Sequence, residues 1–532
     1  MGFITASREQ QVLFGYSLDE FVPKDAKCRF IVEVVKELNL FDLFNDYSDQ
    51  GGAAFDPSVM LSTWFFAYSE GVTSTRELEQ RCLRDMHFIY VSGNLRPDHT
   101  SLSRFRKRHL ERLPGLFVQM VRLARERGVS DFRRICVDGT RLKANASPEH
   151  SVDSSGLDKA LRQVREDIEG YLRECELADS EGTDVEETEA RLAELRRLEQ
   201  TYLERQRQLK ERKERLNPQN RPRHRINTTD PDALCMKKVN GARGVPGYSG
   251  QASVDAASGL IVAADAASAA NDTGQFSAQH AQVEQTLGTD GQRQYVADAG
   301  YHSLDELEYI EQNHVDAVIA DPREDRRSTP TAQGVPEGDG HFRRADFHYD
   351  ATSDTYVCPA GETLSFRNEW TDAHGTRFRI YGRWCTACVH ARRCCKGNGQ
   401  RHYKRVFRNV REKLAEDMAR KAQSEEGRSR MNERFARSES VFGNLKENLG
   451  FRGVRLRGLA SVRGEFLLMC LGHNLNRLFR LLGTAASGPL GGPNPTTTVR
   501  AAFCRLMDAF MKTFFASWSA SSATLIPIHS VP

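Results

Sequence analysis

Two aspartates with matched surroundings are the residues of this sequence best suited to chemistry. Asp138 follows the short apolar run 134–137 and Asp298 follows the run 294–297, and each precedes a turn that contains glycine. Such runs predict buried strands. If the two strands are parallel neighbours, both carboxylates lie at one edge of the sheet, where open α/β sheets bind ligands. Converging carboxylates repel each other unless a cation lies between them, and sites built only from oxygen favour Mg²⁺ or Mn²⁺.

A later segment supplies a candidate third ligand, Glu439. Residues 438–446 are predicted to be helical, and Lys446 follows Glu439 by seven residues, which is about 20° from two full turns. The carboxylate and the cation would then face the same way roughly 10 Å apart, an arrangement that suits a metal with a phosphate lying across it. The plainer alternatives are that the aspartates only cap turns and that Glu439 is a solvated residue on an exposed helix.

Cysteines form a second possible site. Most of the 12 cysteines are isolated, but five of them fall close together at Cys358, Cys385, Cys388, Cys394 and Cys395. Two thiolates in a Cys385-x-x-Cys388 pattern are typical of a zinc knuckle, and Cys358 with Cys394 can complete one tetrahedral Zn²⁺ site. The fourth ligand stays open, because Cys395, His390 and His402 can each replace Cys394. A set of free thiols in a loop is the alternative to any metal.

Charge and hydropathy limit the possible function classes. The 75 Lys and Arg residues nearly balance 72 Asp and Glu, so only local clusters can point to nucleic acid. The apolar stretch 466–482 is interrupted by polar and charged residues, which argues against a membrane-spanning helix and a membrane partner. The first residues lack the pattern of an export signal. We therefore expect a cytoplasmic protein. The basic clusters are at 104–108, 401–411 and 452–463.

The pattern of apolar residues predicts an α/β fold assembled from several parts. Residues 20–125 are expected to form an N-terminal all-α domain that ends in a basic helix. Residues 130–152 and 225–320 then show strands and helices in the order β, ββ, α, β, α, β, which is typical of a mixed sheet with helices on its faces. The C-terminal part of this α/β domain, at 412–482, carries the Glu439 helix.

Two insertions and a tail complete the expected organisation. Residues 153–216 are dense in Glu, Arg, Leu and Gln, which predicts a charged helical hairpin, and we interpret it as an assembly element. Residues 321–411 are expected to be a loop-rich, Cys-rich insertion that holds the possible zinc site. Residues 484–532 are predicted to be a linker and tail.

Three segments carry a pattern that is more specific than any single residue: 137–147, 296–303 and 439–446. They resemble the three catalytic motifs of bacterial insertion-sequence transposases of the DDE type. The closest resemblance is to the group numbered eleven eighty-two, within the larger assembly around insertion sequence five. Further similar segments extend the resemblance over roughly residues 20–480; they are 55–57, 77–79, 97–106, 229–233, 247–252, 271–272, 450–452 and 457–459.

This resemblance implies a ribonuclease-H-like mixed sheet, with Asp138 and Asp298 on neighbouring strands and Glu439 on a later helix. It also implies a homo-oligomer that cleaves transposon terminal inverted repeats in double-stranded DNA and joins them to target DNA, with two Mg²⁺ or Mn²⁺ ions on the three carboxylates. Lys446 and Lys143 would hold phosphates. The DNA-binding residues of the helical domain would be Arg104, Arg106 and Lys107.

The sequence departs from the family pattern beside the third motif. Ser438 and Ser440 stand where the family more often has an apolar residue and a proline, and Phe435 stands where an arginine often precedes the glutamate. Asp255 and Glu447 match no catalytic position. Two rival functions remain open, a DNA-binding or domesticated transposase that no longer cuts and a hydrolytic nuclease on the same fold. The presence of all three carboxylates argues against the first, because a protein that only binds DNA has no use for them.

Overall fold

The structure is a computed structural model in which most of the 532 residues are described. The described residues are 3–4, 17–47, 54–179, 186–214, 224–236, 244–289, 292–321, 342, 344–372, 375–385, 388, 390, 394 and 402–483. The expected linker and tail at 484–532 lie outside them. None of the described helices is long and apolar enough to cross a membrane.

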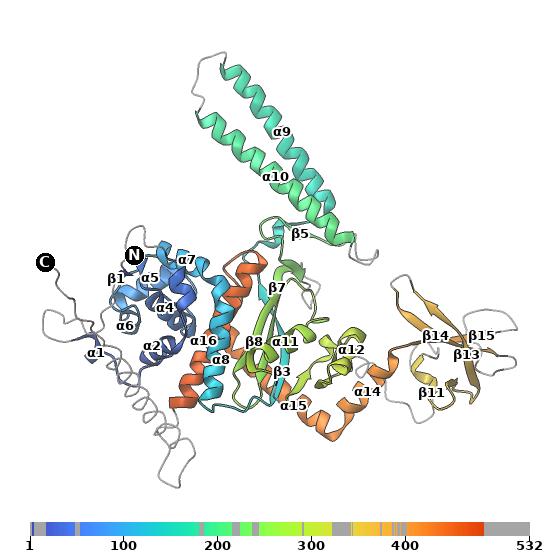
Figure 1. The fold of residues 1–532 in the computed structure, drawn as a ribbon. Helices are drawn as coiled ribbons and strands as arrows, with labels where there is room; N and C mark the ends of the chain where they lie inside the picture. The colour runs from blue at the N-terminus through green and yellow to red at the C-terminus, as the bar shows by residue number, and fades with distance from the viewer. Residues whose placement is uncertain are drawn as a thin grey trace, which may run out of the picture.

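A mixed sheet forms the centre of the molecule (Figure 1). Its main strands are β3 (Arg134–Lys143), β7 (Val245–Asp255), β8 (Ile261–Ala267), β9 (Gln294–Ala297) and β10 (Asp316–Ile319). Strands β9 and β10 run parallel to β3, whereas β7 is antiparallel to both β3 and β8. The resulting order is β10-β9-β3-β7, with β8 and the short strand β6 (Leu234–Met236) both on β7. The predicted mixed α/β arrangement is therefore confirmed.

Helices pack against this sheet. Helix α11 (Phe276–Leu287) contacts β7 and β8, and α12 (Leu304–Gln312) connects β9 to β10. Helix α14 (Glu412–Gln423) contacts β10, and α15 (Glu425–Gly443) lies against β3 and β9. The segment that carries Glu439 is therefore brought to the strands that precede the two aspartates, although it lies far from both in the sequence.

The N-terminal part is helical, as predicted. Its longer helices are α2 (Lys27–Glu37), α4 (Pro57–Ser69), α5 (Thr75–Arg84), α7 (His99–Arg108) and α8 (Leu113–Glu126). The shorter ones are α1 (Leu18–Phe21), α3 (Phe41–Asn45) and α6 (Met86–Val91). Helix α4 begins at Asp56, whose carboxylate accepts the Ser58 N–H at 2.8 Å, and Asp98 caps α7 in the same way.

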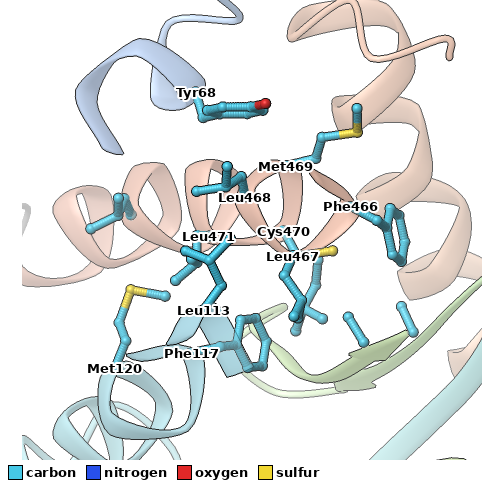
Figure 2. Packing of buried hydrophobic residues seen from close by; sticks show 14 of the residues in the cluster. Tyr68, Leu113, Phe117, Met120, Phe466, Leu467, Leu468, Met469, Cys470 and Leu471 are labelled. Atoms are coloured by element: carbon cyan, nitrogen blue, oxygen red, sulfur yellow. The ribbon is translucent and has the colours of Figure 1, made fainter. Parts of the chain in front are cut away.

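Helix α16 (Leu459–Gly483) joins the helical part to the sheet. It contacts α4, α8 and β8, and apolar residues of all four elements form one continuous core. Figure 2 shows the side chains 466–471 of α16 among Tyr68 of α4 and Leu113, Phe117 and Met120 of α8. The helical part and the central sheet thus bury apolar surface against each other, which holds them in one fixed arrangement.

The charged segment forms two long helices, α9 (Ser154–Asp179) and α10 (Glu186–Glu214), that pack side by side and project away from the body (Figure 1). At their base, β4 (Ser151–Val152) pairs with β5 (Ile226–Asn227). A small core of Leu157, Leu209 and Ile226 fixes this base. The expected turn near residue 180 falls mostly outside the described residues.

The expectation of a loop-rich insertion at 321–411 is wrong for much of its described part. Five antiparallel strands form a second sheet: β11 (His348–Asp350), β12 (Thr355–Val357), β13 (Thr363–Thr371), β14 (Arg377–Cys385) and β15 (His402–Asn409). This sheet has its own core, which includes Tyr356, Leu364, Tyr381 and Val406. In β14 arginines alternate with aromatic and aliphatic residues along Arg377–Ile380, so a period of two was present in that part of the sequence beneath a high polar content.

Candidate active site

Asp138 and Asp298 lie at the same edge of the central sheet. Val137 of β3 pairs with Ala297 of β9 in parallel register, and each aspartate is the next residue along its strand. Asp138 accepts the Gly139 N–H at 2.8 Å, and Asp298 accepts the Gly300 N–H at 2.8 Å. Burial raises the pKa of the Asp138 carboxyl above its ordinary value, and the charge of Asp298 acts in the same direction. The two aspartates that the sequence analysis placed at one edge of the sheet therefore lie near each other in the structure.

Arg434 of α15 balances the charge of Asp138. One guanidinium nitrogen lies 3.0 Å from the Asp138 carboxylate, and the Arg434 side chain is only 11% exposed. Its charge, together with the Ser438 hydroxyl, opposes the upward shift of the Asp138 pKa. The family pattern places an arginine at the position of Phe435. In the structure it is the preceding residue, Arg434, that forms the ion pair with Asp138. The spacing of four between Arg430, Arg434 and Ser438 is the feature of the sequence that indicates this position for Arg434, because residues four apart share one helix face.

A further carboxylate, Asp272, reaches this edge from the segment between β8 and α11. Its Oδ1 accepts a hydrogen bond from the Gln251 amide at 2.6 Å and lies 3.3 Å from the Ser249 hydroxyl. A methyl group at Gly139 would collide with that oxygen, and one at Gly300 would lie 3.0 Å from Asp298 and 3.2 Å from Asp272. The two glycines therefore make room for a third acid beside the aspartate pair. The sequence analysis had noted residues 271–272 only as a segment similar to the family.

Glu439 lies on α15 one residue after Ser438, and therefore about 100° around the helix from it. Its side chain is exposed, and it forms no metal-binding group with Asp138 and Asp298 among the described residues. The structure thus places Glu439 on a helix that packs against β3 and β9 without grouping the three carboxylates. Within the described parts of the chain, no three acids, cysteines or histidines are arranged to hold a metal ion.

Lys446 lies in a segment that departs from regular α-helical geometry. The expected helix 438–446 changes at Asn444–Asn448 into a π-helical turn, so the two-turn geometry predicted for Glu439 and Lys446 is wrong. Burial lowers the pKa of the Lys446 ammonium, and the charges of Glu447 and Asp138 oppose that shift. The Lys446 cation therefore interacts electrostatically with the Asp138 carboxylate, as a phosphate-binding lysine at this site would.

Lys143 occupies the opposite end of β3, five residues and about 17 Å from Asp138. Its carbonyl accepts the Val454 N–H at 2.8 Å, which ties β3 to the segment before α16. Beside it, a cavity of about 330 Å³ is lined by Thr73, Asn145 and residues 450–455. Arg455 spans the helical part and this segment, since its Nε donates to the Thr73 hydroxyl at 2.6 Å. Lys143 and Arg455 thus place two basic side chains on the part of the molecule that lies away from the aspartates.

The basic helix α7 presents only part of its charge to solvent. Arg104 and Lys107 are exposed, whereas Arg106 is buried, with 7% of its surface exposed. The Arg106 guanidinium stacks over Trp64 at 4.6 Å and donates to the Tyr68 hydroxyl and the Thr73 carbonyl. The expectation that Arg106 contacts phosphate is therefore corrected: it is a packing residue of the helical part.

The cysteine cluster is drawn together in the second sheet. Cys358, Cys385, Cys388 and Cys394 line one small cavity of about 20 Å³, and His390 also lines it. The Cys358 thiol accepts the Glu362 N–H at 3.4 Å in the turn between β12 and β13. Cys395 and the side chain of His402 lie outside the described residues. The four cysteines chosen from spacing alone therefore share one site.

The two competing carboxylates have structural partners. Asp255 is fully buried at the end of β7 and accepts both the N–H and the hydroxyl of Ser258, at 2.7 and 2.6 Å. Glu447 is exposed and pairs with Arg452 at 2.6 Å. Neither contacts the aspartate pair, so both remain outside the site.

Comparison with known protein families identifies both parts of the molecule. Residues 357–479 match a family model described as a transposase DDE domain, and residues 16–108 match a transposase domain model (DUF772). The chain is an insertion-sequence DDE transposase. The first match covers β13 to β15 of the second sheet, α14, α15 and most of α16, and thus includes Glu439; the second covers α1 to α7. No curated protein matches the transposase. As a DDE transposase, the protein is an enzyme that cuts or transfers polynucleotide strands and binds DNA.

Proposed function

We propose that the transposase cleaves the terminal inverted repeats of its element and joins the freed ends to target DNA. The observation that carries the proposal is the register of β3 and β9, which brings Asp138 and Asp298 to one sheet edge beside Asp272. The strand order β10-β9-β3-β7-β8, with only β7 antiparallel to its neighbours, supports a ribonuclease-H-like catalytic domain. The motif resemblance further supports membership of the group numbered eleven eighty-two.

The donors at this edge fit Mg²⁺ or Mn²⁺, because they are carboxylate oxygens and hard cations prefer oxygen ligands. Asp138, Asp298 and Glu439 would hold two such ions, which activate the attacking oxygen and stabilise the leaving oxygen when bound. The chain's own part is positioning and charge balance. Arg434 neutralises Asp138 in the free protein, and Lys446 neutralises a phosphate of the bound strand.

A product assay tests this function against its rivals. Purified transposase is incubated with a labelled duplex that carries the element's terminal repeat, a supercoiled target plasmid and Mg²⁺ or Mn²⁺. We expect both nicked ends and products in which the labelled end is joined to the plasmid. Nicked DNA alone would identify a hydrolytic nuclease. Binding of the duplex with no new product in either metal would identify a catalytically silent binding protein.

We further propose that the helical part, with Arg104 and Lys107 on phosphates, binds the transposon end. Each phosphate contact that is lost should reduce the slope of log affinity against log salt concentration by about 0.9. Alanine at Arg104 or at Lys107 is therefore expected to weaken end binding and to flatten this slope without lowering the melting temperature, because both side chains are exposed.

Alanine at Arg106 provides the matched comparison within the same helix. It removes a buried guanidinium from Trp64 and Tyr68, so we expect a lower melting temperature and an unchanged slope for the folded fraction. Fluorescence anisotropy over a salt series measures the slopes. Unchanged slopes at both Arg104 and Lys107 would mean that α7 faces something other than DNA.

We propose a structural zinc site on two grounds, the spacing of the cysteines and the cavity that they share; the thiols would have to close around the ion, because no three of them are grouped to hold a metal among the described residues. Thiolates are preferred zinc ligands, and Cys358, Cys385, Cys388 and Cys394 line one cavity beside the core of the second sheet. Purified, reduced transposase should carry about one Zn²⁺ per chain. Cys385→Ser should lower that content and make the second sheet more susceptible to proteolysis, whereas Cys175→Ser on α9 should do neither. Metal analysis that finds no zinc in the wild-type protein would reject the site.

We also propose that the transposase acts as a homo-oligomer that pairs two DNA ends, with the α9–α10 hairpin as an assembly element. The hairpin projects from the body and buries a small core at its base, together with Leu161, Val164 and Leu195 along its helices. Its remaining surface is rich in charges of both signs, which suits contact with another chain or with the body.

A further inference from the structure

The second sheet has two faces with different surroundings. Side chains of directly opposite residues in antiparallel strands lie on the same face. One face carries Tyr381 and Val406 into the small core. The pairs Trp370 with Phe378, Ile380 with Phe407, Gly382 with Arg405 and Trp384 with Tyr403 lie on the other. We name this second set the aromatic face; it consists of Trp370, Phe378, Trp384, Tyr403, Arg405 and Phe407.

The aromatic face leaves large rings in contact with solvent. Trp384 is 60% exposed, Trp370 is 48% exposed and Phe407 is 39% exposed. Apolar side chains exposed singly are ordinary, but a contiguous group of this size marks an interaction site. Figure 1 shows the sheet set apart from the body, joined to it through α14. The face is therefore available to a partner that is not part of the described chain.

The rings form two groups with a gap between them. Trp370 packs against Phe378 at 5.6 Å and Phe407 at 6.0 Å between ring centroids, and Trp384 packs against Tyr403 at 4.9 Å. Gly382 lies between the groups, and the Tyr403 hydroxyl lies so close over it that a Cβ would collide. Arg405, opposite Gly382, is exposed in the same gap. The face thus presents flat rings on both sides of one cation.

The charged residues of the second sheet indicate which kind of partner fits the aromatic face. Residues 348–411, which span the sheet, contain twelve lysines and arginines and five acids, which are Asp350, Asp354, Glu362, Glu369 and Asp372. Glu369 pairs with Arg379 in the strand register and so lies on the opposite face. Asp372, two residues past Trp370, is the acid at the end of the aromatic face, and its carboxylate accepts the Thr376 N–H at 2.8 Å in the β13–β14 turn. A strongly basic segment with exposed rings suits a polyanion that has flat, apolar groups.

We propose that the aromatic face binds single-stranded DNA, with bases stacked near Trp370 and Trp384 and a phosphate held by Arg405. In a duplex the faces of the bases are already stacked, so only an unpaired strand can offer them to protein rings. Phe378 and Trp384, which mark the two ring groups, are six residues apart on β14, about 20 Å, which leaves room for several nucleotides. The inference rests on the proposed DNA strand cleavage, which produces free strands near the site.

Binding of a short labelled thymidine oligonucleotide to the full-length transposase tests this proposal. We expect Trp370→Ala combined with Trp384→Ala to weaken binding by at least about tenfold, since a base stacked on an aromatic ring contributes strongly to affinity. Arg405→Ala should weaken binding and flatten the salt dependence. Phe366→Ala is the matched control, because Phe366 is also 39% exposed but pairs with Tyr381 on the opposite face.

The outcomes separate this proposal from the proposed function. Duplex terminal repeats should still bind to the double tryptophan variant, since they are bound by other parts of the chain. Equal affinity of wild type and double variant for the oligonucleotide would overturn the aromatic-face proposal, as would an equal loss in Phe366→Ala. A change in oligomer mass in the double variant, with unchanged oligonucleotide affinity, would assign the face to a second copy of the chain. Failure of the wild type to bind duplex ends would count against the proposed function instead.

Discussion

Asp138→Asn, Asp298→Asn and Glu439→Gln are each expected to reduce strand cleavage and joining by about a thousandfold or more. Each change keeps the volume and shape of the side chain but removes one negative charge. The metals that these groups are proposed to hold stabilise charge in the transition state, which no other group at the site can replace. DNA binding should persist or become tighter, because a repulsive charge near phosphate is gone. Rates come from the end-joining assay, and affinities come from anisotropy.

The Glu439→Gln variant is the most discriminating test of this prediction. In the free protein its side chain is exposed and forms no metal-binding group with the aspartates among the described residues, so Glu439→Gln should leave the melting temperature unchanged while activity is lost. Glu447→Gln is the matched control on the same segment, because Glu447 forms an exposed ion pair with Arg452, and it should keep most activity. Full activity in Glu439→Gln, together with loss in Glu447→Gln, would show that the wrong glutamate was chosen.

Metal dependence checks the same site without mutation. Mn²⁺ should replace Mg²⁺, whereas Ca²⁺ should support binding without turnover because its coordination is larger and looser. Turnover that persists in a chelator would contradict the assignment of the carboxylates. The three aspartates at this edge lie close together in the free protein, and Arg434 is the main positive charge that balances them. Because Mg²⁺ would bind the folded site and balance these carboxylates, its addition should raise the melting temperature.

The aspartate pair could be predicted from the sequence because its signals are local. An apolar run, an aspartate and a glycine-containing turn are sufficient to predict a strand end, and parallel pairing then brings both residues to one edge. Asp272 could not be placed in this way, since its contacts with Gln251 and Gly139 depend on how three separate segments fold together.

Other features could not be predicted from the sequence because contacts between distant segments determine them. Arg106 has the same sequence surroundings as Arg104, and only the position of Trp64 on another helix explains its burial. The π-helical turn at Asn444–Asn448 is accompanied by a hydrogen bond from Asn444 to His473 of α16 at 2.9 Å, a partner far along the chain. The second sheet was missed because its strands are rich in arginine and its cysteines suggested a loop.

Gly472→Ala is expected to destabilise the transposase, because α16 and α4 touch through their backbones at this residue. A methyl group at Gly472 would lie 2.6 Å from the Tyr68 carbonyl oxygen and 2.7 Å from its carbon. Backbone atoms cannot turn aside, so the two helices must move apart and loosen the core shown in Figure 2. Overpacking of this kind costs about 1–3 kcal/mol of the free energy of unfolding, more than the better helix propensity of alanine restores.

Gly170→Ala on α9 is the matched control, because no atom lies within 4 Å of the added methyl group. It should raise the free energy of unfolding slightly, through helix propensity alone. Gly472→Ala should instead lower the melting temperature by several degrees in a scan at fixed protein concentration. Joining activity should also be lost at a lower temperature, since residues next to Gly472 hold the sheet: Asn474 bonds both backbone groups of Ile261, and His473 bonds the Gly259 carbonyl. An unchanged melting temperature would mean that the helical part does not rest on α16 in solution.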